Sequence, residues 1–224
     1  MSAPPLVPSP LFGLRTWSSV GEQGSERLAA PQRGTPWPDA GEWLTARCGT
    51  DPDHHAPEAG CACGIHAWHP SRKAARKVLG MRWEVPGVVE LAGAVEVHRE
   101  GLRAERARPY ALFVLPSANA ARAERLAAAH RAQVVPVRGA DEAAAWCRDR
   151  GLGLSPAAVV RLLGPEALAK EQRARRHRRR VAGLKLGAIT AVVAAAIAGG
   201  IVAFDPPDHR LFGRSGWVDP PSAR

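Results

Sequence analysis

Two stretches, residues 88–98 (VVELAGAVEVH) and 102–115 (LRAERARPYALFVL), carry the clearest strand pattern of the chain. At 95–98, valine alternates with a charged or polar residue, and this period of two places the two kinds on opposite faces of a strand. The short connection through Gly101 suits a hairpin. Proline has no N–H to donate within a sheet, so we expect Pro109 at an edge or a bulge.

The segments around this hairpin predict an α+β fold: a small β-rich domain with alanine-rich helices, followed by one C-terminal transmembrane helix. A first strand is expected at 11–17, a short one at 134–137, and helices that begin at the capping residues Ser71, Ser117, Asp141 and Ser155. The predicted divisions are a disordered leader (1–10), a β-rich domain (11–115), a helical segment (116–164), a basic juxtamembrane helix (165–185), a transmembrane helix (186–204) and a short extracytoplasmic tail (205–224).

The transmembrane prediction rests on residues 186–204 (LGAITAVVAAAIAGGIVAF), which contain no charge. Nineteen helical residues span about 28 Å, close to the hydrocarbon thickness of a bilayer. The alternative is a helix buried within a soluble protein, but a domain of this size would have to surround it on every side. Small residues recur every fourth position on one stripe, which would let two such helices pack closely as a homodimer, although an alanine-rich helix also yields such a stripe by chance. They are Gly183, Gly187, Ala191, Ala195 and Gly199.

A basic collar precedes the apolar run. The chain has a formal net charge of +10, and eight basic residues with one acid lie within 170–185. Basic flanks are retained in the cytoplasm, so we expect a single-pass cell-membrane protein with its N-terminus inside and its C-terminus outside. Anionic membrane lipids are the expected partners, and nucleic acid is disfavoured because no aromatic residue interrupts the run. The collar residues are Arg173, Arg175, Arg176, Arg178, Arg179, Arg180 and Lys185.

Cysteine and histidine gather between 48 and 66. Residues 1–12 show no basic region ahead of an apolar run, so we expect no export of the N-terminal part and reduced thiols. Thiolate and imidazole donors at this spacing favour a tetrahedral zinc site, although the Cys61–Cys63 spacing is one residue shorter than in the usual metal knuckle. Free buried thiols without metal, or a redox pair, are the alternatives. Cys147 lies in an alanine-rich helical stretch and is expected to be a small core residue.

These residues also resemble an uncharacterised actinobacterial family. Its members show a cysteine, then His-x-Ala-Pro, then Cys-x-Cys-Gly-Ile, and the corresponding run here is 54–57 followed by 61–65. A later Gly-x-Arg-Ala-Glu motif matches 101–105, where Leu102 departs from the family's aromatic residue. The resemblance covers roughly residues 11–115 and implies His54 rather than His55 as a ligand. The predicted zinc ligands are then Cys48, His54, Cys61 and Cys63.

No phosphate-binding glycine loop, nucleophile elbow or His-Glu-x-x-His helix is present, so the sequence leans away from an enzyme. We expect a membrane-tethered cytoplasmic binding or scaffold module with a structural zinc site and an unidentified protein partner. One alternative is a regulator that binds nucleic acid or an acidic partner through the basic collar. The other is a thiol redox protein.

Overall fold

The structure is a computed structural model that describes residues 10–22, 24–31, 34–51, 53–58, 60–81, 84–166, 168–169 and 173. The chain divides into two compact units, 1–171 and 172–224, and every strand and helix named below belongs to the first. That unit is an α+β fold, as the sequence predicts.

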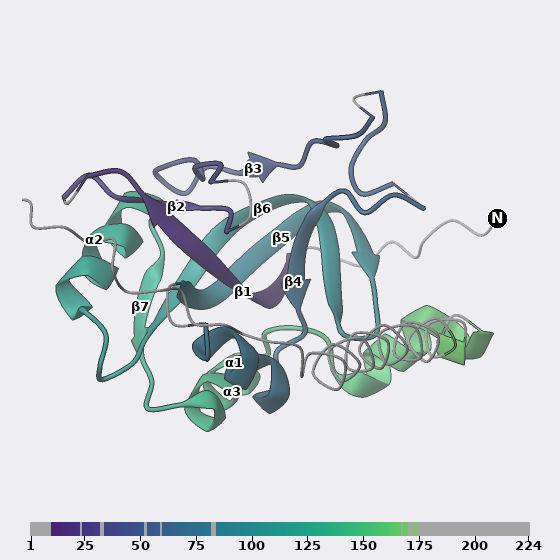
Figure 1. The fold of residues 1–224 in the computed structure, drawn as a ribbon. Helices are drawn as coiled ribbons and strands as arrows, with labels where there is room; N and C mark the ends of the chain where they lie inside the picture. Colours follow the sequence, from purple (N-terminus) through teal and green to yellow (C-terminus); the bar gives the residue numbers. More distant parts are fainter. Residues whose placement is uncertain are drawn as a thin grey trace, which may run out of the picture. The chain divides into compact units, whose positions relative to one another are not determined.

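The predicted hairpin is confirmed, and it is the longest strand pair of the sheet. Strands β5 (Val85–Val97) and β6 (Gly101–Val114) run antiparallel, with register shifts at two places along the pair. Pro109 pairs with Val89 at the first of these shifts, which confirms the bulge expected there. Extra residues at bulges bend a strand and increase its twist. Both strands accordingly curve strongly (Figure 1).

This curvature lets four strands close into a ring. Strand β1 (Leu11–Val20) pairs with β5, while β4 (Ile65–Trp68) pairs with β6 on the other side of the hairpin. A single pairing between β1 and β4, Leu14 with Trp68, completes the circuit β1–β5–β6–β4. The backbones approach closely beside β4, where a Cβ on Gly101 would overlap the carbonyl oxygen of Ala67.

Three short strands extend the ring into a seven-stranded mixed sheet. Strand β2 (Arg27–Ala29) pairs with β1, and β3 (Leu44–Thr45) pairs with β6, both antiparallel. Strand β7 (Gln133–Pro136) lies parallel to the end of β6. It confirms the strand predicted at 134–137 and brings part of the predicted helical segment into the sheet.

Helix α1 (Arg72–Leu79) begins as predicted, since the Ser71 hydroxyl accepts a hydrogen bond from the amide of Ala74. The cap predicted for the next helix was wrong. Helix α2 (Ala120–His130) is capped by Asn119, because Ser117 belongs to a turn that the Ala118 amide closes on the Leu115 carbonyl.

Helix α3 (Ala140–Asp149) also begins differently from the prediction. Gly139 precedes it without a side-chain cap, and Asp141 lies inside the first turn rather than at the cap. A fourth helical stretch covers 156–166 and is capped by Ser155, as expected. It extends past the predicted end at 163, across Gly164, whose φ is +70°.

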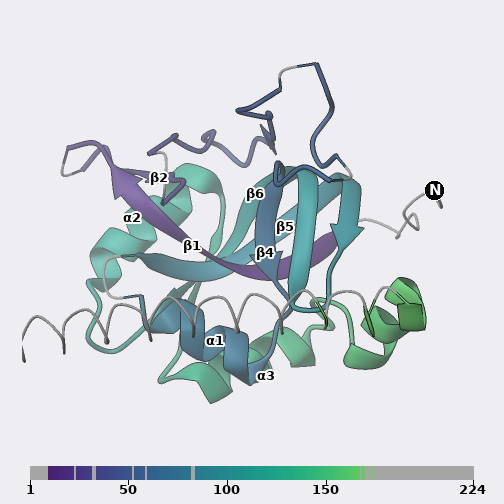
Figure 2. The same ribbon diagram turned by 45° about the vertical axis from the view of Figure 1, so that its right-hand side comes forward.

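The sheet separates two apolar clusters because successive side chains of a strand point to opposite faces. One cluster includes Trp17, Trp37, Leu91, Leu102 and Leu112, with Leu126 of α2 among them. The other lies between the sheet and the pair α1 and α3, which are side by side in Figures 1 and 2. Cys147 is fully buried in this second cluster, which confirms its prediction as a core residue.

The predicted transmembrane helix and all collar residues except Arg173 lie outside the described residues. Arg173 is helical and exposed. Within the described part of the chain, the helices are all too short or too polar to cross a bilayer.

Candidate metal centre

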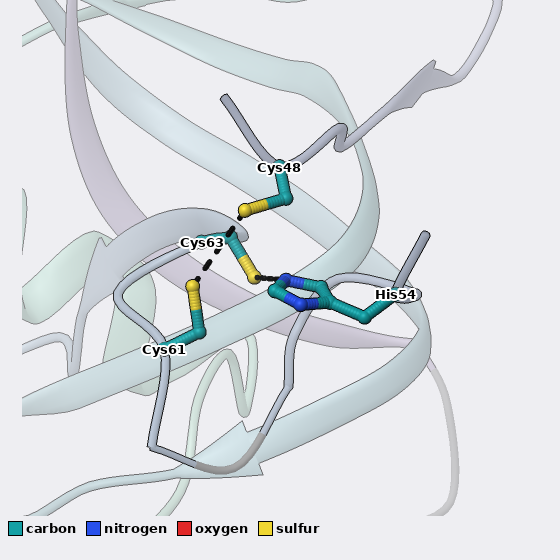
Figure 3. A group of neighbouring side chains, drawn as sticks. All are labelled: Cys48, His54, Cys61 and Cys63. Carbon is teal, nitrogen blue, oxygen red and sulfur yellow. Dashed lines mark hydrogen bonds between the residues drawn. The ribbon is translucent and has the colours of Figure 1, made fainter. Parts of the chain in front are cut away.

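The four predicted ligand residues lie on one long connection, which runs from the end of β3 to the start of β4. Cys48 lies near its beginning, and His54, Cys61 and Cys63 follow before β4. Strands β3 and β4 both pair with β6, so β6 fixes where this connection begins and where it ends. The four side chains point toward one another (Figure 3).

The distances within the cluster suit a tetrahedral zinc site. One ligand atom from each residue lies within 4.8 Å of the other three. The sulfurs of Cys48 and Cys61 are 3.7 Å apart, and Nε2 of His54 is 3.1 Å from the Cys63 sulfur. With the usual zinc–ligand bond lengths, a tetrahedron has edges of about 3.8 Å between two sulfurs and about 3.5 Å between sulfur and nitrogen. These residues can therefore hold a metal ion with small movements.

The charge of the cluster also suits a cation. Burial raises the pKa of the Cys63 thiol, and the neighbouring sulfurs of Cys61 and Cys48 raise it further. The pKa of Cys48 is lowered to about 6, first by the Thr50 hydroxyl and then by backbone amides. Thiolates at these positions would repel one another, and a divalent cation bound between them would remove most of that repulsion.

The carboxylate of Asp51, which is not a predicted ligand, orients the ring of His54. Nδ1 of His54 lies 3.5 Å from a carboxylate oxygen of Asp51, which leaves Nε2 to face the sulfurs. The Asp51 carboxylate also accepts a hydrogen bond from the amide of Asp53, and the Asp51 amide donates to the Cys48 sulfur. A carboxylate behind a ligating imidazole fixes its tautomer and ring orientation in many zinc sites. Sequence reasoning missed Asp51, although its spacing of three from His54 is a usable signal.

Arg103 on β6 fastens the ligand-bearing loop to the sheet. Its buried guanidinium donates to the carbonyl oxygens of Cys61 and Glu58, and it forms an ion pair with Glu96 of β5. Glu105, two residues further along β6, accepts a hydrogen bond from the amide of Ala94. The carbonyl partners of Arg103 are distant in sequence, so no local pattern could reveal them.

Gly64, directly after the last cysteine, allows this loop to lie against Arg103. Its φ is +113°, a conformation that side chains rarely tolerate. A Cβ at this position would also stand 2.6 Å from Cγ of Arg103. The Cys-x-Cys-Gly run thus ends in glycine for both backbone and packing reasons.

The other two histidines of the segment lie outside the cluster. His55 is exposed, and Nε2 of His66 donates to the carbonyl oxygen of Ala62. The structure therefore groups His54 rather than His55 with the cysteines. No family model, curated protein or solved structure matches this chain.

Proposed function

We propose that this chain is a membrane-tethered cytoplasmic binding or scaffold module in which Cys48, His54, Cys61 and Cys63 hold a structural zinc ion. The observation that carries this proposal is the convergence of four soft donors at distances close to those of a zinc tetrahedron. Four protein ligands fill the coordination sphere, whereas catalytic zinc sites keep one position open for water or substrate. The proposed role of the zinc ion is therefore structural, and we propose the module as a non-enzymatic one.

The loop around the cluster explains why a metal would be needed. Between β3 and β4, the described residues form only turns, bends and irregular structure. Such a segment buries little apolar surface, and Ala56 is its one buried apolar residue among those described. Metal binding contributes directly to folding free energy in regions of this kind.

The membrane tether is proposed from the sequence. The uncharged run 186–204 has the length of a bilayer span, and the basic collar favours an N-terminal domain on the cytoplasmic side, against anionic lipids.

Half-buried tryptophans support a binding role. The Arg108 guanidinium lies 4.6 Å from the Trp43 ring centroid, and that of Arg150 lies 4.4 Å from the Trp146 ring centroid. Tryptophan and arginine are enriched among the residues that dominate interface binding energy. A protein partner is consistent with these two stacked pairs.

The test is metal analysis of the full-length protein purified in detergent, comparing His54→Ala with His55→Ala. We expect about one zinc ion per chain in the wild type and in His55→Ala, because His55 lies outside the cluster. His54→Ala removes one of four donors, so its zinc affinity should fall at least about 10-fold. Equal zinc content and affinity in the two variants would exclude the proposed ligand set.

A further inference from the structure

The sulfurs of Cys48 and Cys61 lie close enough to react with each other as well as to bind a metal ion. We propose that these two residues are a reversible modification site, at which a hydroperoxide such as hydrogen peroxide forms a Cys48–Cys61 disulfide and releases the zinc ion. This inference rests on the proposed zinc site and adds regulation by oxidants to it.

The geometry selects this pair. The two sulfurs lie 3.7 Å apart, beyond the bond length of about 2.05 Å but close enough to join after a small shift of the loop. The cysteines are thirteen positions apart in the chain, so the disulfide closes a ring of ordinary size. Cys61 and Cys63 have one residue between them and would close a small, strained ring.

Both sulfurs are accessible, and Cys48 is the better placed to react first. Cys48 and Cys61 are partly exposed, unlike the buried Cys147. The Cys48 sulfur lies 3.1 Å from the Thr50 hydroxyl and accepts a hydrogen bond from the Asp51 amide. Donors directed at a sulfur stabilise its thiolate, which is the nucleophilic form.

The reaction balances with the peroxide as the only oxidant. The Cys48 thiolate attacks one peroxide oxygen, the O–O bond breaks, and the leaving hydroxide takes a proton to become water. The Cys61 thiolate then attacks the sulfur of the Cys48 sulfenic acid, and the S–O bond breaks to release a second water after protonation. Two thiolates, one hydrogen peroxide and two protons give one disulfide and two waters.

Loss of two donors explains release of the metal. A disulfide sulfur is a far poorer ligand than a thiolate, so only Cys63 and His54 would remain to hold the ion. Arg103 holds the Cys61 and Glu58 carbonyls independently of the metal, so the anchored side of the loop stays in place. Reduction of the disulfide then restores the original donor set.

The experiment treats zinc-loaded full-length protein in detergent with one equivalent of hydrogen peroxide. Released zinc is measured with a chromogenic chelator, and disulfides are mapped by peptide mass spectrometry. We expect one zinc ion released per Cys48–Cys61 disulfide formed, and rebinding after treatment with dithiothreitol and zinc. Cys147→Ala should behave like the wild type, because that thiol lies in the core.

The stoichiometry of the two readouts supplies the decisive comparison, because each zinc ion released must be matched by one Cys48–Cys61 disulfide. Zinc retention in the oxidised protein, zinc release without a mapped Cys48–Cys61 disulfide, or a Cys61–Cys63 linkage would each overturn the proposed disulfide. Absence of zinc from the untreated protein would instead overturn the proposed function and the release of metal, while the mapped linkage would still decide the sulfur pairing.

Discussion

At the scale of single residues, His130 is the clearest pH-sensitive group in the core. It is fully buried, its Nδ1 donates to the Pro38 carbonyl, and its Nε2 accepts a hydrogen bond from the Leu28 amide. Only the neutral imidazole can donate at one nitrogen and accept at the other. Burial lowers the pKa of His130, and nearby Arg27 lowers it further, against opposing effects of the Pro38 bond and Asp39.

This arrangement predicts a pH dependence of stability. Because the pKa of His130 is lower in the folded protein than the unfolded value of about 6.5, the unfolded chain takes up the proton first as pH falls. Neutral His130 therefore stabilises the fold fully above about pH 6.5, and this contribution is lost as the pH falls below that value. Urea unfolding of wild type and His130→Gln above and below about pH 6.5 measures the effect. We expect the free energy of unfolding to change less with pH in the variant. Identical slopes would contradict the prediction.

Sequence reasoning identified the cluster residues because their side-chain chemistry is specific and their spacing is short. Cys48, His54, Cys61 and Cys63 indeed come together in the structure. Arg103 was not identified, because its partners on the loop are more than forty positions away and are carbonyl groups that every residue carries. Hydrogen bonds to backbone carbonyls cannot be predicted from the types of the residues that carry them.

At the scale of elements, Arg103 links the β5–β6 hairpin to the metal-binding loop. We predict that Arg103→Met lowers the free energy of unfolding by about 3 kcal/mol, because it leaves Glu96 without its buried cation. It should also weaken zinc binding about 10-fold, since the Cys61 carbonyl loses its donor. Chemical denaturation and competition with a zinc chelator measure the two effects.

Arg106→Met is the matched control on the same strand. Its guanidinium is about half exposed and lies 3.8 Å from a Glu105 oxygen, so its loss should change stability by less than about 0.5 kcal/mol. If both arginine variants weaken zinc binding equally, Arg103 does not hold the loop.

The hairpin, the first strand, β7 and the Ser71 and Ser155 caps were predictable because each depends on a local pattern. The closure of four strands into a ring could not be predicted from the sequence. It depends on bulges in β5–β6 and on the close approach of β4 to its neighbours, features that are set by pairing between distant segments. The cap of α2 was mispredicted because the nearby polar residues Ser117 and Asn119 compete for that role, whereas α3 begins at Gly139 without a side-chain cap.

At the scale of the whole molecule, the proposed tether predicts where the protein is found after cell fractionation. We expect the full chain to sediment with membranes and to be released by detergent. Val193→Arg combined with Ile197→Arg places two charges in the apolar run, at a cost of about 3 kcal/mol each near the bilayer centre. This double variant should move to the soluble fraction.

Val160→Arg is the control, because Val160 is an exposed apolar residue outside the apolar run. It should remain with the membranes. Recovery of the unaltered full chain in the soluble fraction without detergent would contradict the tether while leaving the zinc proposal intact.

The most direct test of the central claim is thermal unfolding of the zinc-loaded full-length protein in detergent, with and without a strong chelator. A ligand present at about a thousand times its Kd stabilises a protein by about 4 kcal/mol, which corresponds to about 10 °C in a domain of this size. We predict that chelation lowers the midpoint by about that amount and that added zinc restores it. An unchanged midpoint after the chelator has removed the zinc would contradict the account.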